Sequence, residues 1–227
     1  MQIIAHRGAS GYKPENTLAS FQKAISLGVD MIELDVFAIR SGEVVVHHDK
    51  KVNRTTNGTG NISDYTWSEL RLLDAGDGQR IPLLTEVLDL VNGRIPINIE
   101  LKGHGIAEPV ATIIDSYISK KQWQSQMFLV SAFDHVELKR FAVLCPSVPI
   151  GALYRSRPRR LHRFIKSDNF ISANFDAKFI TRGDVLDAHA RGLKVYAYTV
   201  NDRRSANRMR AMKVDGVFTN YPDLIAK

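Results

Sequence analysis

Two acidic residues, Glu33 and Asp35, lie two positions apart in an apolar stretch of the chain. In an extended strand, residues two apart point to the same face, so these carboxylates would lie side by side. A third carboxylate, Glu100, stands in a similar stretch just before Lys102. Close carboxylates repel each other unless a cation neutralises them, and hard oxygen ligands suit Mg²⁺ or Ca²⁺. Exposed strand ends would explain one such residue but not three, so the pattern predicts a site for one divalent cation.

Two histidines and two basic residues accompany these carboxylates. His6 and Arg7 end the first apolar run, His48 follows a later run, and Lys102 follows Glu100. Positive charge from a metal ion and basic side chains stabilises the non-bridging oxygens of a phosphodiester. One imidazole can accept the proton of the nucleophile while the other protonates the departing alkoxide. A lone histidine on a strand is more often structural, but this combination favours catalysis by both.

The choice of His48 over the adjacent His47 depends on a predicted hairpin. Two β-prone runs flank Ser41-Gly42 too closely for a crossover helix. If these two residues form the turn, Asp35 lies opposite His48. Adjacent strand residues face opposite ways, so His47 would point away from Asp35.

Short β-branched runs alternate with amphipathic segments along the chain, which is the pattern of βα units. Strands are expected at about residues 2–6, 31–36, 95–100, 127–131, 148–153, 169–173, 194–199 and 215–219. Such units can close a barrel whose strand C-termini converge on one face. The sequence therefore predicts an α/β fold, a single (β/α)8 TIM barrel over residues 1–227. A β-hairpin and a polar excursion after the second strand, together residues 37–82, interrupt the pattern.

The composition narrows the range of partners. A formal charge of +7 favours an anionic partner, but the densest basic stretch lacks the interleaved aromatics that stack exposed bases. That stretch comprises Arg155, Arg157, Arg159, Arg160 and Arg163, which we interpret as a solvated helix face. No apolar run approaches the roughly 20 residues that span a bilayer, and the first residues do not resemble a signal peptide. We therefore expect a cytoplasmic protein with no nucleic-acid partner and no stable membrane insertion.

The candidate residues lie within longer sequence motifs that resemble those of the glycerophosphodiester phosphodiesterase family. The matching words are Ala5-His6-Arg7-Gly8, Pro14-Glu15-Asn16-Thr17, Ile32-Glu33-Leu34-Asp35, His48-Asp49, Arg54-Thr55-Thr56-Asn57-Gly58, Asp74-Ala75-Gly76, Ile81-Pro82, Ile99-Glu100-Leu101-Lys102, Tyr198-Thr199-Val200-Asn201, Val214-Asp215-Gly216 and Thr219-Asn220. They span nearly the whole chain in family order, and the shorter cytoplasmic bacterial members look closest.

The resemblance implies a β/α barrel of lipid and glycerol metabolism. Its expected reaction hydrolyses glycerophosphodiesters, such as glycerophosphocholine or glycerophosphoethanolamine, to sn-glycerol 3-phosphate and an alcohol. The glycerol hydroxyl beside the phosphate is the implied first nucleophile. The implied roles are acid/base catalysis for His6 and His48, metal binding for Glu33, Asp35 and Glu100, and phosphate contact for Arg7 and Lys102. One departure from the family is a short loop, Asp77-Gly78-Gln79-Arg80, which bears on alcohol selectivity.

Two other functions fit part of the pattern. A lysophospholipase D would need an apolar groove, for which the excursion after His48 offers Ile62, Tyr65 and Trp67. A non-catalytic phosphate-binding barrel would keep the basic residues but would not need two histidines and three carboxylates. The expected partner is therefore a small-molecule substrate, and the oligomeric state stays open.

Overall fold

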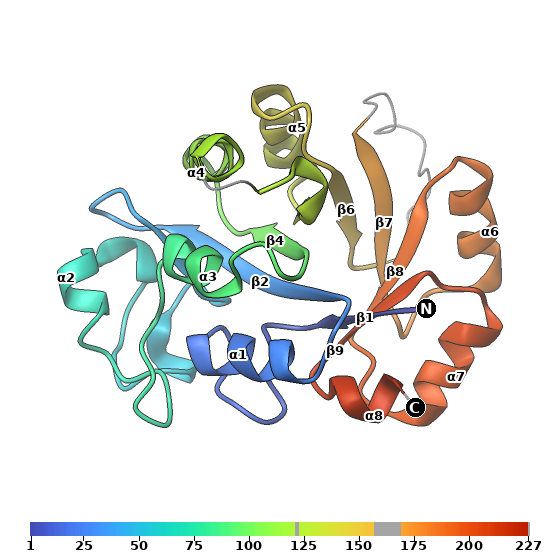
Figure 1. Cartoon of the computed structure of the whole chain (residues 1–227), viewed down its shortest axis with the longest axis horizontal. Coiled ribbons are helices and arrows are strands. Elements are labelled where there is room, and N and C mark those ends of the chain that lie inside the picture. Colours follow the sequence, from blue (N-terminus) through green and yellow to red (C-terminus); the bar gives the residue numbers. More distant parts are fainter. Residues whose placement is uncertain (121–122, 157–168, 227) are drawn as a thin grey trace.

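The fold is a closed barrel of eight parallel strands with helices on its outside (Figure 1). The computed structural model describes residues 1–120, 123–156 and 169–226. The strands follow the order β1-β2-β4-β5-β6-β7-β8-β9, and β9 pairs with β1 to close the ring. This arrangement confirms the predicted (β/α)8 barrel.

The expected strands correspond to the observed ones with ends shifted by a few residues. The strands are β1 Gln2–Ala5, β2 Met31–Ala38, β3 Val44–Val46, β4 Ile97–Leu101, β5 Phe128–Ala132, β6 Ile150–Tyr154, β7 Phe170–Asp176, β8 Lys194–Tyr198 and β9 Gly216–Thr219. The α-helices are α1 Leu18–Ser26, α2 Trp67–Leu70, α3 Leu84–Val91, α4 Ala107–Lys120, α5 His135–Leu144, α6 Arg182–Ala190, α7 Arg203–Ala211 and α8 Pro222–Ala226. Single 3-10 turns are η1 Val52–Arg54, η2 Ile62–Asp64 and η3 Ser125–Met127. Within the described ranges, no helix has the length and apolar character needed to cross a bilayer.

The interior of the barrel is apolar at one end and charged at the other. Its apolar end is a buried cluster of five inward side chains, Ile4, Met31, Leu129, Tyr196 and Phe218. On β2, Glu33 and Asp35 follow Met31 on the same face, because side chains alternate along a strand. Glu100 on β4 pairs directly with Asp35. The parallel strands thus place the carboxylates together at their C-terminal rim.

The hairpin between β2 and β3 has a longer turn than predicted. Phe37 pairs with Val45, and the amide of Ile39 donates to the carbonyl of Glu43 at 3.1 Å. The loop therefore contains residues 40–42. Its last residue, Gly42, has a φ of +99°, a conformation that side chains with a Cβ rarely adopt.

This turn changes the predicted register by one residue. The amide of His47, not that of His48, faces Asp35 and donates to its backbone carbonyl at 2.9 Å. The prediction that Asp35 lies opposite His48 is therefore wrong. Because β3 ends at Val46, the side chains of the two histidines no longer follow strand alternation.

The excursion after β3 packs against the β2–β3 hairpin to form a small core, although its sequence suggested a segment too polar for this. Its buried cluster comprises Phe37, Ile39, Val45, Val52, Ile62, Leu70, Ala75 and Ile81. Tyr65 and Trp67 pack against this cluster, so they do not form an open groove. Figure 1 shows the excursion with α2 on one side of the barrel, far from α6 and α7.

Truncating a side chain of this cluster should destabilise the protein. Leu70 is fully buried whereas Leu72 is 73% exposed in the same segment. Leu70→Ala should therefore lower the free energy of unfolding by about 2–5 kcal/mol. Leu72→Ala should change it by less than about 0.5 kcal/mol. Urea unfolding followed by circular dichroism measures both, and equal effects of the two variants would contradict this packing.

Candidate active site

Three carboxylates meet at the C-terminal rim of the barrel, where β2 and β4 lie side by side. One oxygen each of Glu33, Asp35 and Glu100 lies within 4.8 Å of the others, and all three residues are buried. That spacing is about twice a Ca–O bond of roughly 2.3–2.6 Å, so one ion could contact all three. The all-oxygen donor set fits Mg²⁺ or Ca²⁺.

Burial and neighbouring charges give the carboxylates divergent pKa values. Burial, reinforced by the other two carboxylates, raises the pKa of Glu33 well above its usual range. Burial also raises the pKa of Glu100 to about 7. Burial acts on Asp35 in the same direction, but Lys102 and Arg7 outweigh it and hold the pKa of Asp35 well below its usual range. Without a cation, Asp35 is therefore the most readily ionised of the three carboxylates.

The two predicted basic residues reach this cluster from different strand ends. Nζ of Lys102 lies 3.1 Å from Oδ1 of Asp35 and also forms an ion pair with Glu100. Nε of Arg7 lies 3.4 Å from Oδ2 of Asp35, and its backbone amide donates to Oε2 of Glu33 at 2.7 Å. Arg7 therefore contacts the carboxylates through both its side chain and its backbone.

The turn after β1 holds Arg7 in an unusual backbone conformation. Arg7 has a φ of 57° and Gly8 a φ of 78°. A Cβ on Gly8 would lie 2.7 Å from the Cβ of Ser20, so no larger residue fits there. Asn16 also has a φ of 57°, and its amide nitrogen donates to Oδ2 of Asp35 at 2.9 Å. Left-handed non-glycine residues of this kind concentrate at functional sites.

His6 follows β1 and is held by the C-terminal end of the chain. Its Nδ1 lies 2.8 Å from Oδ1 of Asn220, so the ring presents Nε2 as its other nitrogen. Burial, aided by the adjacent Arg7, lowers the pKa of His6 to about 4. His6 is therefore neutral at pH 7.

His48 lines the site, whereas His47 does not. Nδ1 of His48 lies 2.6 Å from Oδ1 of Asp49. Burial lowers the pKa of His48, and Asp35 and Asp49 oppose that effect. His47 is 4% exposed, and its Nε2 contacts the carbonyl of Lys51 at 3.3 Å. The sequence thus selected the right histidine for the cavity through an incorrect register.

A cavity of about 700 Å³ collects these groups. Six of the seven predicted site residues line it, and Asp35 lies beneath them, in contact with Arg7 and Lys102. Four polar residues that were not predicted from the sequence also contact the site: Glu15, Asn16, Asp49 and Asn220. All four lie within the sequence motifs that resemble the family, and this position is the feature of the sequence that could have identified them.

The wall of the cavity also contains aromatic side chains. Phe133 and Tyr198 line it with perpendicular rings whose centroids are 5.9 Å apart. The guanidinium carbon of Arg155 lies 4.4 Å from the centroid of Phe133. Arg155 therefore covers an aromatic wall and is not part of a helix face. The other four arginines of the basic stretch fall outside the described residues.

Replacing Glu33 with Gln should stabilise the metal-free protein at neutral pH. Because the folded-state pKa of Glu33 lies above its unfolded value, stability is greatest below pH 4.5 and falls as the pH rises through the folded value. Gln keeps an acceptor for the amide of Arg7 without the charge. In chelator at pH 8, Glu33→Gln should raise the free energy of unfolding by about 1–4 kcal/mol. Urea unfolding should show this gain shrinking towards pH 4, and a pH-independent difference would contradict it.

Comparisons with known proteins identify the family to which the chain belongs. Residues 6–224 match the Glycerophosphoryl diester phosphodiesterase family. A glycerophosphodiester phosphodiesterase of Bacillus altitudinis is 36% identical, with 100% of this chain and 97% of that protein covered. An Oleispira antarctica phosphodiesterase, solved with the product sn-glycerol-3-phosphate, has a TM-score of 0.92 at 31% identity, covering 100% of this chain and 95% of that chain. A human lysophospholipase D is 29% identical over 96% of this chain and 83% of its own length. This chain belongs to the glycerophosphoryl diester phosphodiesterase family.

Proposed function

We propose that the chain catalyses metal-dependent hydrolysis of glycerophosphodiesters, such as glycerophosphocholine and glycerophosphoethanolamine, to sn-glycerol 3-phosphate and an alcohol. The observation that carries the proposal is that His6 and His48 line the same cavity as Glu33 and Glu100. Two proton-transfer groups and ligands for a cation then face one substrate-sized volume, an arrangement suited to metal-assisted cleavage of a phosphodiester. The product held by the Oleispira antarctica relative supports this choice of substrate.

Glu33, Asp35 and Glu100 are the proposed ligands of one divalent cation, Mg²⁺ or Ca²⁺. When bound, such an ion supplies positive charge that stabilises the non-bridging oxygens of the phosphate. Since burial raises the pKa of both Glu33 and Glu100, binding the ion requires these two groups to lose protons. The affinity for the metal should therefore rise with pH.

Arg7 and Lys102 are the proposed phosphate contacts. Both side chains line the cavity and both are mostly buried, with 16% and 14% of their side-chain surface exposed. Burial alone would lower the pKa of each, but neighbouring carboxylates raise it, so both remain cationic at neutral pH. Fixed cations in a partly dehydrated cavity suit an anionic phosphodiester.

His6 and His48 are suited to opposite proton transfers. A pKa of about 4 keeps His6 neutral at pH 7, the state that a general base needs. Burial lowers the pKa of His48, but Asp35 and Asp49 oppose that effect, so His48 is more readily protonated than His6 and is the better candidate for the general acid. We therefore assign the base to His6 and the acid to His48.

Lysophospholipase D activity is a second candidate. The cavity wall contains Phe133 and Tyr198, which could contact an acyl chain, and the human lysophospholipase D relative favours testing this possibility. The side chains first considered for such a groove, including Tyr65 and Trp67, instead pack against the small core of the excursion. The smaller, deacylated substrates therefore remain the favoured class.

The direct test measures product release after removal of metal. Protein treated with EDTA should not release sn-glycerol 3-phosphate from glycerophosphocholine, and Mg²⁺ or Ca²⁺ should restore release. Glu33→Gln, Asp35→Asn and Glu100→Gln should each lower kcat/KM at least about a hundredfold, because loss of a ligand removes transition-state charge stabilisation. Parallel incubation with lysophosphatidylcholine separates the candidates, since only a lysophospholipase D forms lysophosphatidic acid. Absence of both products with either metal would contradict the proposal.

Removing either catalytic histidine should affect one limb of the pH profile. His6→Ala and His48→Ala should each lower kcat by about 10²–10⁴-fold. Because a base is inactivated by protonation, His6→Ala should flatten the acidic limb of kcat/KM, and His48→Ala should flatten the alkaline limb. Their combined loss should be smaller than the product of the two, since they act together.

His47→Ala is the control for this pair. The buried His47 ring contacts the carbonyl of Lys51 and does not line the cavity, so kcat should stay within about threefold of the parent. Urea unfolding of this variant detects any loss of stability separately. A folded His47→Ala protein as inactive as His48→Ala would overturn the assignment of His48.

A further inference from the structure

We propose that Arg54 is a positioning residue for the reaction, which holds His48 and Arg7 in a fixed relation through Asp49 and Glu15. The inference rests on the proposed function, because that proposal assigns His48 to proton transfer and Arg7 to the phosphate. Arg54 is not among the residues that line the catalytic cavity. It acts on the cavity through the two carboxylates.

The first contact orients His48. Oδ1 of Asp49 forms a hydrogen bond with Nδ1 of His48 at 2.6 Å. Oδ2 of Asp49 accepts a hydrogen bond from Nε of Arg54, also at 2.6 Å. With both oxygens engaged, the carboxylate cannot rotate without breaking a charge-assisted hydrogen bond. The imidazole is therefore held by its Nδ1, which leaves Nε2 for the substrate, as in other histidine–carboxylate pairs.

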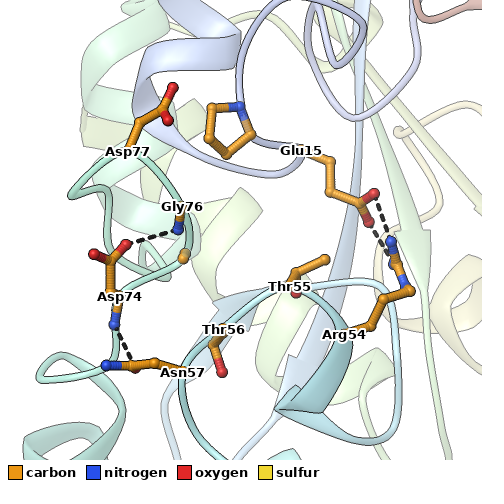
Figure 2. A pocket seen from close by; sticks show the side chains of 10 residues that line it. Glu15, Arg54, Thr55, Thr56, Asn57, Asp74, Gly76 and Asp77 are labelled. Atoms are coloured by element: carbon orange, nitrogen blue, oxygen red, sulfur yellow. Dashed lines mark hydrogen bonds and ion pairs between the residues drawn. The ribbon is translucent and has the colours of Figure 1, made fainter.

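The second contact reaches Arg7. Nη1 and Nη2 of Arg54 donate to the two carboxylate oxygens of Glu15 at 2.9 and 2.7 Å, the paired bonds drawn in Figure 2. Oε1 of Glu15 also accepts from Nη1 of Arg7 at 2.8 Å. Burial tends to raise the pKa of Glu15, but Arg54 and Arg7 lower it to about 2, so the carboxylate is ionised at neutral pH. A continuous path of ionic hydrogen bonds thus joins Arg7, the proposed phosphate contact, to His48, the proposed acid.

The backbone beneath Arg54 is anchored. Arg54 ends the 3-10 turn η1, whose first residue, Val52, is fully buried in the excursion's core. The hydroxyl of Thr56 donates to the carbonyl of Val52 at 2.8 Å. Asn57 and Asp74 then join the segment to the next loop by two hydrogen bonds, of 3.1 and 2.9 Å. The guanidinium therefore projects from a fixed base.

Local stability alone does not explain this arrangement. The Arg54 side chain is 49% exposed, and exposed ion pairs contribute little to folding. Arg40 and Glu69 form a comparable exposed pair at 3.0 Å in the same region, remote from the histidines. What distinguishes Arg54 is that one planar group satisfies two carboxylates at once. A lysine ammonium lacks that forked geometry.

A second cavity makes Arg54 accessible from outside the catalytic one. It measures about 610 Å³ and is lined by Arg54 and Glu15 on one side (Figure 2). Asp74 and Asn57 lie across it, as the same view shows. A small cation could therefore reach the position of a truncated Arg54 without entering the substrate site.

The experiment combines truncation with chemical rescue in the full-length protein. Arg54→Ala should lower kcat for glycerophosphocholine with Mg²⁺ by about 10–100-fold, the usual range for partners that orient catalytic groups. KM should rise less, and the midpoint of urea unfolding should change little. Guanidinium at millimolar concentration should restore at least tenfold of the lost kcat. Arg54→Lys should stay impaired, whereas Arg40→Ala should keep the parental rate and show no guanidinium response.

Several outcomes would overturn the inference. These are a kcat for Arg54→Ala within about threefold of Arg40→Ala, a lack of guanidinium rescue in a folded variant, or full activity in Arg54→Lys. Should Arg54→Ala fail to fold, the folded Arg54→Lys variant decides, because parental activity in it is incompatible with a required fork.

A readout independent of activity separates this inference from the proposed function. In the parent, ¹⁵N NMR at pH 7 should show the His48 ring protonated at Nδ1, with the signal assigned by its loss in His48→Gln. Arg54→Ala should shift that signal towards the position of an unprotonated Nδ1, because Asp49 is then no longer held against the ring, and guanidinium should reverse the shift. An inactive parent with the expected NMR change would refute the proposed function alone. An active parent with an unchanged His48 signal in Arg54→Ala would refute the inference alone.

Discussion

Three carboxylates share one rim of the barrel, at positions where a barrel interior is ordinarily apolar, and burying an ionised carboxylate costs several kcal/mol unless it is paired. Much of the surrounding structure compensates this buried negative charge. Lys102 comes from the end of β4, while Arg7 and Asn16 come from the loop after β1, and all three contact Asp35. Arg7 and Asn16 both have a left-handed backbone, a conformation that is concentrated at functional sites, and both side chains contact Asp35. The geometry of the candidate site thus depends first on how buried negative charge is balanced.

The sequence predicted the barrel well because the periodic spacing of apolar residues along the chain indicates which residues are buried. Each strand carries an apolar run bounded by turn residues, and parallel strands place their C-terminal residues at one rim whatever the details of the loops. The proximity of Glu33, Asp35 and Glu100 could therefore be predicted from the sequence alone. The spacing of the two β2 carboxylates is a property of an extended chain, and the pairing of Asp35 with Glu100 follows from neighbouring strands.

The details that the sequence left open depend on contacts between distant segments. A third residue in the hairpin loop changed the register, and the position of His48 is set after β3 has ended, where alternation gives no guidance. The excursion looked polar because its apolar residues are scattered, yet Val52, Ile62 and Leu70 converge in a small core. The link from Arg54 to Glu15 joins residues 39 positions apart and has no periodic pattern that could reveal it.

The hydrogen bond between His6 and Asn220 joins residues 214 positions apart. The amide of His6 also donates to the carbonyl of Thr219 at 2.9 Å, which extends the pairing of β1 with β9 that closes the barrel. During translation, all three carboxylates and His48 would leave the ribosome long before Asn220, the residue that orients His6. Such late, long-range closure is slow relative to local helix formation. An incomplete nascent chain therefore carries the proposed metal-binding carboxylates without an oriented His6, the proposed base, until β9 and Asn220 are in place.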